Sequence, residues 1–256
     1  MRNRRRKLGE AEDEAHVEHG HAEGGDGHAD GAAVQEPEVP AEVVAGDDEA
    51  DGDGLRKLQA TGLPLVRLGI VDRHLYVSGV TGSTGSGRSP VEGTHHPRRH
   101  SDLYSYGALS HRHAPEVTGI VRGLTGQDIA LHFVPHSGPF ARGIHATTQA
   151  RLVRPMSSAD VRMALTDFYA GQPFVHVLAD APRMKDIVGS NYAHLCATTD
   201  GDSLAVMSVI DNLTKGAAGG AIQWLNRLHG WDQTLGLTAT TDGDSLAVMS
   251  VIDNLT

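Results

Sequence analysis

Cysteine is almost absent from this chain of 256 residues, which contains one, and aromatic residues make up only 4% of it. A single cysteine, Cys196, excludes a disulfide framework. No apolar run approaches the roughly 18 residues that a membrane-spanning helix needs. The basic run at residues 2–7 is not followed by the apolar stretch of a secretory signal. We therefore expect a cytoplasmic protein without a membrane partner.

The acidic residues gather near the N-terminus. Residues 1–54 hold 16 of the 32 acidic residues, five basic residues and no aromatic residue. Such a segment cannot bury enough apolar surface to offset its chain entropy, so we predict a disordered tail. Its histidines, at positions 16, 19, 21 and 28, have no spacing that fixes a coordination geometry. Its basic run competes with its own acidic residues, so we predict neither a metal site nor a nucleic-acid partner.

Residues 55–237 have the pattern of one mixed α/β domain, and their length is ordinary for a single core. Short β-rich runs bounded by Gly, Pro and Asp predict strands at Leu75–Ser78, Ile129–Val134, Gly143–Leu152, Phe174–Leu178 and Leu204–Ile210.

Three segments predict helices. Pro115 begins one with an apolar stripe, and Ser157 caps a second that ends before Gly171. The third spans Lys215–Leu228, and we expect Ala218, Ile222 and Leu225 to point inward.

The last 18 residues of the sequence repeat an earlier segment. Residues 197–214, ATTDGDSLAVMSVIDNLT, recur unchanged as residues 239–256. The first copy predicts a buried strand that leads into the third helix. The second copy has no such helix after it, so it either adds an edge strand, competes with the first copy, or stays unpaired.

The run His111-Arg112-His113-Ala114-Pro115-Glu116 places two imidazoles and a carboxylate where a helix begins. A rigid junction of this kind suits a general base. The alternative is a pair of surface histidines beside a helix cap. Upstream, residues 80–88 form a Gly/Ser/Thr loop ending in Arg88, which is typical of loops that bind phosphate or carboxylate oxygens, although it also fits a flexible turn.

Taken in order, the motifs TGSTGSGR, THHP, HRHAPE, PHSGPFARGI, FYAGQPFV, GSNYA and IDNLTKGAAGGA resemble the catalytic domain of the NADPH-dependent acyl-phosphate reductases. The resemblance covers residues 63–237. Two branches are similar: N-acetyl-γ-glutamyl-phosphate reductase, and the reductase of aminoadipyl or glutamyl phosphate carried on an acidic amino-group carrier protein. It implies the α+β catalytic domain of a glyceraldehyde-3-phosphate-dehydrogenase-like reductase, with the Rossmann half missing.

The resemblance also implies a function and a set of site residues. The expected reaction reduces an acyl phosphate to a semialdehyde in arginine or lysine biosynthesis, through a cysteine thioester, with NADPH as cofactor. A homo-oligomer is implied as well. By their places in the motifs, the catalytic residues are His111 and Glu116; the substrate-binding residues are Thr81, Thr84, Arg88 and Arg142; the cofactor-binding residues are Asn212, Lys215, Gly216 and Gly219.

The chain departs from the family at the nucleophile. The family's cysteine aligns near Asp53, where this chain has no thiol. Cys196 lies in a small apolar run and is expected to pack as a small hydrophobe. The alternative function is therefore a catalytically inactive dimerisation or carrier-binding remnant.

Arg98, Arg99 and His100 follow the THHP motif and predict an exposed basic loop. One interpretation is a docking site for an acidic carrier protein. The other is a solvated loop with no partner.

Overall fold

The computed structural model describes residues 62–87, 89, 91–237, 240–242 and 245–247. The predictions for the acidic tail, for position 53 and for Arg88 lie outside the described residues.

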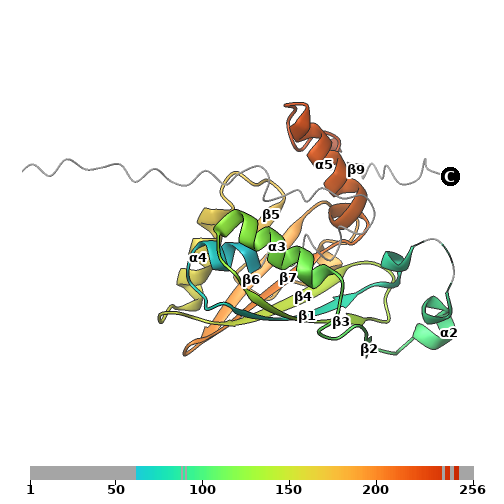
Figure 1. Ribbon diagram of the computed structural model, residues 1–256. Coiled ribbons are helices and arrows are strands. Elements are labelled where there is room, and N and C mark those ends of the chain that lie inside the picture. The colour runs from blue at the N-terminus through green and yellow to red at the C-terminus, as the bar shows by residue number, and fades with distance from the viewer. Residues whose placement is uncertain (1–61, 88, 90, 238–239, 243–244, 248–256) are drawn as a thin grey trace, which may run out of the picture. The chain divides into compact units, whose positions relative to one another are not determined.

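A seven-stranded mixed sheet organises the domain, which confirms the predicted α/β class (Figure 1). The strand order is β2-β3-β1-β4-β7-β6-β5. The pairs β1–β3 and β5–β6 are parallel and the other pairs are antiparallel. The strands are β1 (His74–Thr81), β2 (Tyr104–Ser105), β3 (Ala130–Ser137), β4 (Ile144–Arg151), β5 (Val175–Val177), β6 (Ala193–Asp200) and β7 (Ser203–Ile210).

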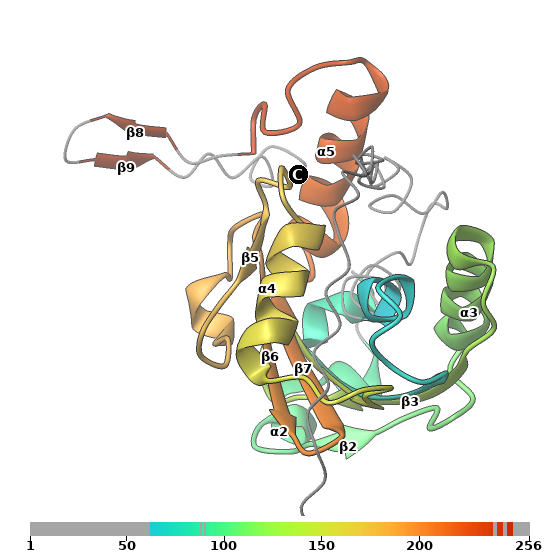
Figure 2. The ribbon, with the colours of Figure 1, turned by 90° about the vertical axis from the view of Figure 1, so that its left-hand side faces the viewer.

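The helices gather over one face of this sheet. Residues 62–67 form a short helix, and α3 (His113–Thr125) and α4 (Ser158–Phe168) lie beside it above the strands (Figures 1 and 2). The remaining turns are α2 (His96–Arg99), short 3-10 helices at Ser83–Ser86, Glu92–Thr94 and Met184–Asp186, a π-helix at Thr214–Ala218, and α5 (Gly219–Leu228).

Local signals set the helix ends. Ser157 accepts a hydrogen bond from the Asp160 amide at 3.1 Å, and the Asp160 carboxylate accepts one from the Ser157 amide at 3.1 Å. This reciprocal cap confirms the predicted start of α4. α3 begins at His113, two residues before Pro115, and stops at Gly126, whose φ of 68° suits glycine.

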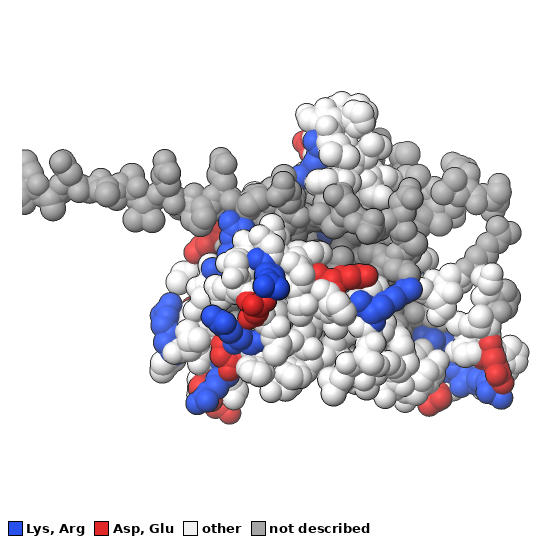
Figure 3. All heavy atoms as spheres, in the orientation of Figure 1, with Lys and Arg blue, Asp and Glu red and all other residues white. Residues whose placement is uncertain are grey.

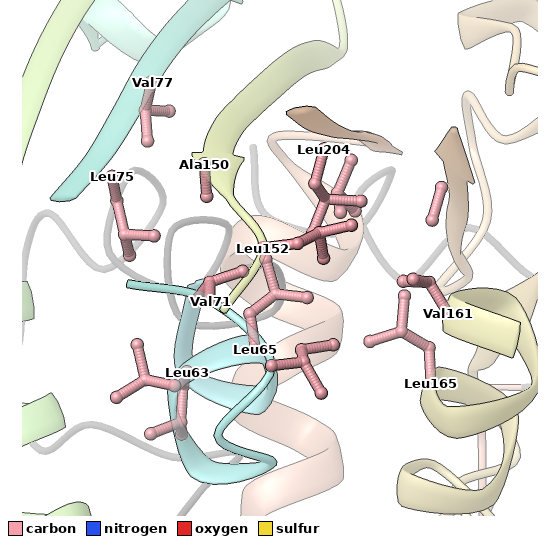
Figure 4. Packing of buried hydrophobic residues seen from close by; sticks show 14 of the residues in the cluster. Leu63, Leu65, Val71, Leu75, Val77, Ala150, Leu152, Val161, Leu165 and Leu204 are labelled. Carbon is pink, nitrogen blue, oxygen red and sulfur yellow. The ribbon is translucent and has the colours of Figure 1, made fainter. Parts of the chain in front are cut away.

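The core lies between the helices and the sheet. It is formed by apolar helix residues and by the alternate strand residues that face the helices. Leu75 and Val77 of β1 meet Leu63, Leu65 and other apolar side chains from α3, α4 and β7 (Figure 4). Each buried aliphatic side chain contributes roughly 1.5–3 kcal/mol, so this layer is the main stabilising feature of the domain.

The opposite face, named here the open face, carries none of those three helices (Figure 2). One register row crosses six strands on it, namely His136, Val80, His145, Val209, His194 and His176. Strands lie about 4.8 Å apart, so four imidazoles stand within one row of the open face.

The orientation of α5 differs from the prediction. Ala218 and Leu225 are exposed and Ile222 is half-buried, whereas the helix buries Gly219, Gly220, Gln223 and Asn226. Gln223 accepts hydrogen bonds from Lys215 and Asn191, and the Asn226 amide donates to the Leu235 carbonyl at 2.9 Å. The polar side chains point inward because their partners are there.

The strand predictions agree with the structure within a few residues, but the patterns miss β2 and β6. The duplicated segment forms its own hairpin from β8 (Thr240–Asp242) and β9 (Ser245–Ala247), apart from the seven-stranded sheet in the described residues. Its register repeats that of the first copy, because Thr240 pairs with Ala247 as Thr198 pairs with Ala205.

Substitution of Gly82 tests how closely the loop that follows β1 packs against Ala141. A Cβ there would lie 2.4 Å from the Ala141 carbonyl oxygen. We expect Gly82→Ala to reduce the free energy of unfolding by about 1–3 kcal/mol, since a backbone carbonyl must shift. Gly119→Ala is the control, because Gly119 lies exposed in α3 with nothing within 4 Å, and it should add about 0.5–1 kcal/mol. Urea denaturation measures both, and an unchanged Gly82→Ala would contradict the close contact.

Candidate functional site

Four loops meet at one edge of the sheet, named here the loop edge. The ends of β1, β3 and β7 lie beside the starts of β4 and β6, as the pairs Thr81–Ser137, Thr81–Ile144, Ile144–Ile210 and Ala193–Ile210 show. The loops at residues 82–87, 138–143, 187–192 and 211–218 therefore converge there. They hold five of the ten predicted site residues, namely Thr84, Arg142, Asn212, Lys215 and Gly216.

The first two of these loops are hydrogen-bonded to each other. The amides of Gly82, Ser83 and Thr84 donate to the carbonyls of Gly143, Phe140 and Ala141 at 2.9, 2.9 and 3.1 Å. The Thr84 hydroxyl donates to the Ala141 carbonyl at 2.7 Å. The donors that the sequence predicts for a ligand are thus used to fix the loop.

Asp211 joins three of the loops through a fully buried carboxylate. It accepts hydrogen bonds from the amides of Gly189, Leu213 and Thr214 at 2.7, 2.8 and 2.9 Å. The Arg142 guanidinium lies 3.1 Å away and also donates to the Thr214 hydroxyl at 3.0 Å. Arg142, predicted to bind substrate, therefore already has a carboxylate partner.

These contacts keep Asp211 ionised. Burial acts to raise the pKa of its carboxyl group, but the hydrogen bonds from Gly189, Thr214, Arg142 and Leu213 outweigh burial and lower the pKa from 3.8.

The predicted cofactor residues are also engaged with their neighbours. Asn212 accepts from the Gly143 amide at 2.7 Å and donates to the Thr84 hydroxyl at 2.8 Å. Lys215 donates to Gln223 at 2.6 Å, and its ammonium lies 5.3 Å from the centre of the Phe174 ring. Asn191 lies so close to Gly219 that a Cβ there would be 2.5 Å from the Asn191 oxygen. Gly216 is buried, and its amide donates to the Asp211 carbonyl at 2.9 Å.

His111 lies in an aromatic cluster before α3. Its ring centre is 4.7 Å from that of His113, 5.3 Å from Phe133 and 5.7 Å from Tyr106, and its Nδ1 accepts from the His113 amide at 3.3 Å. Phe133 precedes Ser137 by four residues, or about 13 Å of strand. Glu116 is exposed in the first turn of α3. The predicted base is thus grouped with aromatic rings rather than with the loop edge.

Cys196 is buried in β6, and its thiol contacts the Ala179 carbonyl at 3.4 Å. Burial raises the pKa of the Cys196 thiol, which disfavours the reactive thiolate. The packing role expected from the sequence is confirmed.

The expected exposed basic loop is wrong for Arg99, which is only 6% exposed. Arg98 remains exposed, and it pairs with Glu92 at 2.7 Å. Acidic and basic side chains also lie side by side on the surface in view (Figure 3). Sequence patterns gave no role to Asp211, Asn191 or Gln223, and they gave Arg99 only a place in an exposed docking loop. The one available signal for Asp211 was its position directly after a buried strand.

Among the described residues there is no group of three or more His, Cys, Asp or Glu side chains arranged to hold a metal ion. In the same part of the chain, every helix is too short or too polar to cross a membrane.

Residues 57–212 match the family described as "Semialdehyde dehydrogenase, dimerisation domain". The N-acetyl-gamma-glutamyl-phosphate reductase of Pseudomonas fluorescens is 35% identical over 220 residues, which cover 79% of this chain and 63% of that protein. The protein of the same name from Methanopyrus kandleri is 36% identical over 217 residues, or 78% and 62% of the two chains. The chain thus spans less than two thirds of these relatives.

Solved structures share the fold at low identity. Aspartate semialdehyde dehydrogenase II from Vibrio cholerae, complexed with ASA, superposes with a TM-score of 0.55 at 15% identity, over 70% of this chain and 61% of that one. Aspartate semialdehyde dehydrogenase from Francisella tularensis gives a TM-score of 0.54 at 10% identity, over 70% and 64%.

Asp211→Asn tests the role of the buried carboxylate. The substitution removes the charge opposite Arg142 and replaces one accepting oxygen by an NH2 donor that faces backbone N–H donors, so we expect a loss of about 3–5 kcal/mol in unfolding free energy. Asp202→Asn is the control, since Asp202 and Arg151 form a 2.7 Å pair whose side chains are 56% and 71% exposed. That variant should change stability by less than about 1 kcal/mol. Equal losses in urea denaturation would refute the distinction.

Proposed function

Because the chain belongs to the semialdehyde dehydrogenase dimerisation-domain family, we propose that residues 55–237 form the catalytic and dimerisation domain of an acyl-phosphate reductase. The proposed substrate is N-acetyl-γ-glutamyl phosphate, or aminoadipyl or glutamyl phosphate carried on an acidic carrier protein, and the proposed reductant is NADPH. The observation that carries the proposal is the 35% identity to a reductase of that name over 220 residues. The family match at residues 57–212 includes His111 and three of the four loops of the loop edge.

Reduction of this kind begins when a thiolate attacks the acyl carbon, forms a thioester and releases phosphate. His111 matches the residue that would take the proton of the family's cysteine, which this chain lacks near position 53, and its Nδ1 accepts a hydrogen bond from the His113 amide at 3.3 Å. Arg142 acts indirectly, because its pairing with Asp211 positions the loop at residues 138–143.

The described residues do not fit a complete dinucleotide. NADPH would supply the hydride, but Asn212 uses both amide atoms within the protein, and Gly219 packs against Asn191. The two Gly-containing segments that follow a strand, residues 82–87 and 211–218, are held by hydrogen bonds within the protein, so neither presents the free Gly-rich turn that binds a pyrophosphate. We expect NADPH binding by this chain to be weak.

The alternative is a dimerisation or carrier-binding protein without catalysis, and the position of Cys196 favours it. Phe133 and Ala197 face the helix-covered core, whereas Cys196, the residue before Ala197, faces the open face. The sheet therefore separates the one thiol of the chain from His111, which packs on Phe133.

A binding measurement separates these functions, and a turnover assay tests whether Cys196 reacts. Titration calorimetry with N-acetyl-γ-glutamyl phosphate should show saturable binding that His111→Ala weakens, because the imidazole lies at the proposed reacting centre. N-acetylglutamate, which lacks the phosphoryl group, is the control ligand. The NADPH-oxidation assay should show no turnover, since the family's cysteine aligns near Asp53, where this chain has no thiol. Absence of binding would leave the alternative, whereas turnover abolished by Cys196→Ser would show that Cys196 reacts.

The open face is the proposed surface for a second copy of the chain. Burial lowers the pKa of His145 and of His194; His176 lowers that of His194 further, while Asp186 opposes the change. Both imidazoles are thus more readily protonated in the unfolded chain, so their contribution to folding stability is complete above pH 6.5 and is lost as pH falls below it. A second copy on this face would bury the same imidazoles further, so we expect association to weaken over the same pH range.

Sedimentation from pH 7.5 to 5.5 should therefore show a falling dimer fraction. The double variant His145→Gln/His194→Gln should flatten this dependence, because it removes the titrating groups. His100→Gln, at an exposed site outside the sheet, should keep it. A dimer that is equally stable at both pH values in the unsubstituted chain would contradict the assignment of this face.

A further inference from the structure

Two neighbouring arginines in α2 have opposite surroundings. Arg98 is exposed and pairs with the carboxylate of Glu92 at 2.7 Å. Arg99 is only 6% exposed, and its side chain runs under the ends of β1 and β3. The pair supplies a buried guanidinium and, one residue away, a matched solvent-exposed one.

Both partners of Arg99 are neutral. Its Nη2 donates to the Thr81 carbonyl at 3.2 Å, and its Nη1 donates to the Ser137 hydroxyl. The Thr81 carbonyl also accepts from the Gly138 amide at 2.9 Å, so it is shared between two donors. The Nε of Arg99 is buried without a hydrogen-bond partner.

A guanidinium stays protonated in proteins, so Arg99 cannot remove its charge by losing a proton. A buried charge is strongly unfavourable unless an opposite charge accompanies it. No carboxylate of the described residues forms an ion pair with Arg99, in contrast to Arg142, which faces Asp211 at 3.1 Å. Arg142 therefore has a carboxylate partner, whereas the positive charge of Arg99 has none among the described residues.

The position of Arg99 indicates what balances it. Thr81 and Ser137 are register partners at the loop edge, and the loops that follow them carry Thr84 and Arg142. Side chains of Thr81 and Ser137 also lie on the helix-covered side, the side on which His111 packs against Phe133. An anion bound here would lie on the same side of the sheet as His111, about 13 Å of strand from Phe133.

The geometry points to Arg99 as the binding residue for an oxyanion, a phosphate or a carboxylate, at the ends of β1 and β3. The planar guanidinium offers two or more N–H donors to such a group, which strengthens binding relative to a neutral contact. Assigning the oxyanion to an acyl-phosphate substrate rests on the proposed function. Binding of inorganic phosphate does not, so the two can fail separately.

The test compares Arg99→Gln with Arg98→Gln in the full chain. Thermal unfolding is followed while inorganic phosphate, or acetate in a second series, replaces chloride at constant ionic strength. The unsubstituted chain and Arg98→Gln should show the same rise in unfolding midpoint with phosphate. Arg99→Gln should bind about tenfold to a hundredfold more weakly, as expected for lost hydrogen bonds to a charged group. The acetate series tells a carboxylate site from a phosphate site.

If Arg99→Gln does not fold, phosphate binding by Arg99→Lys tests the proposal instead. It keeps the charge but loses the paired donors, so phosphate affinity should fall several-fold while the protein stays folded. Two results would overturn the proposal. One is no response of the unsubstituted chain to either anion, and the other is equal affinity in the Arg99 and Arg98 variants.

Discussion

The buried carboxylate of Asp211 is the contact on which the arrangement of the loop edge depends. A carboxylate out of water is stable only when donors fill its oxygens, and here three backbone amides and Arg142 do so. These donors come from three different loops, so one ionised group fixes all three. Asn212, the next residue, extends the same network to Thr84 in the fourth loop. The residues that were expected to contact ligands are for this reason mostly the residues that hold the loops in place.

The sheet divides the molecule into two chemical surfaces. Its helix-covered side carries the core, the His111 cluster and the inward guanidinium of Arg99. Its open face carries Cys196 and a row of four histidines. Since successive side chains of a strand point to opposite faces, no small shift can bring Cys196 to His111. This separation fits a domain in which substrate chemistry and subunit association use opposite sides of one sheet.

The duplicated segment allows the strand pairing of one sequence to be compared in two surroundings. Both copies form a hairpin in the same register, Thr198 with Ala205 and Thr240 with Ala247. The two copies share their alternation of residues and their strand pairing, although only the first copy lies in the seven-stranded sheet. In the first copy β4 and β5 lie on either side of the hairpin, and the segment continues into Asp211 and Asn212 at the loop edge. The same residues gain a structural role only where neighbouring strands and loops are present.

The sequence by itself determined the mixed fold class, most strands within a few residues, the cap of α4 and the burial of Cys196. These features depend on periodicity, capping and residue size, which are local properties. It could not place Arg99, Asp211 or the inward face of α5. Arg99 meets Ser137 across 38 residues and Arg142 meets Asp211 across 69, so their partners exist only after the sheet has formed. A polar side chain is buried where groups distant in the sequence satisfy its hydrogen bonds, so its burial is determined by the tertiary structure.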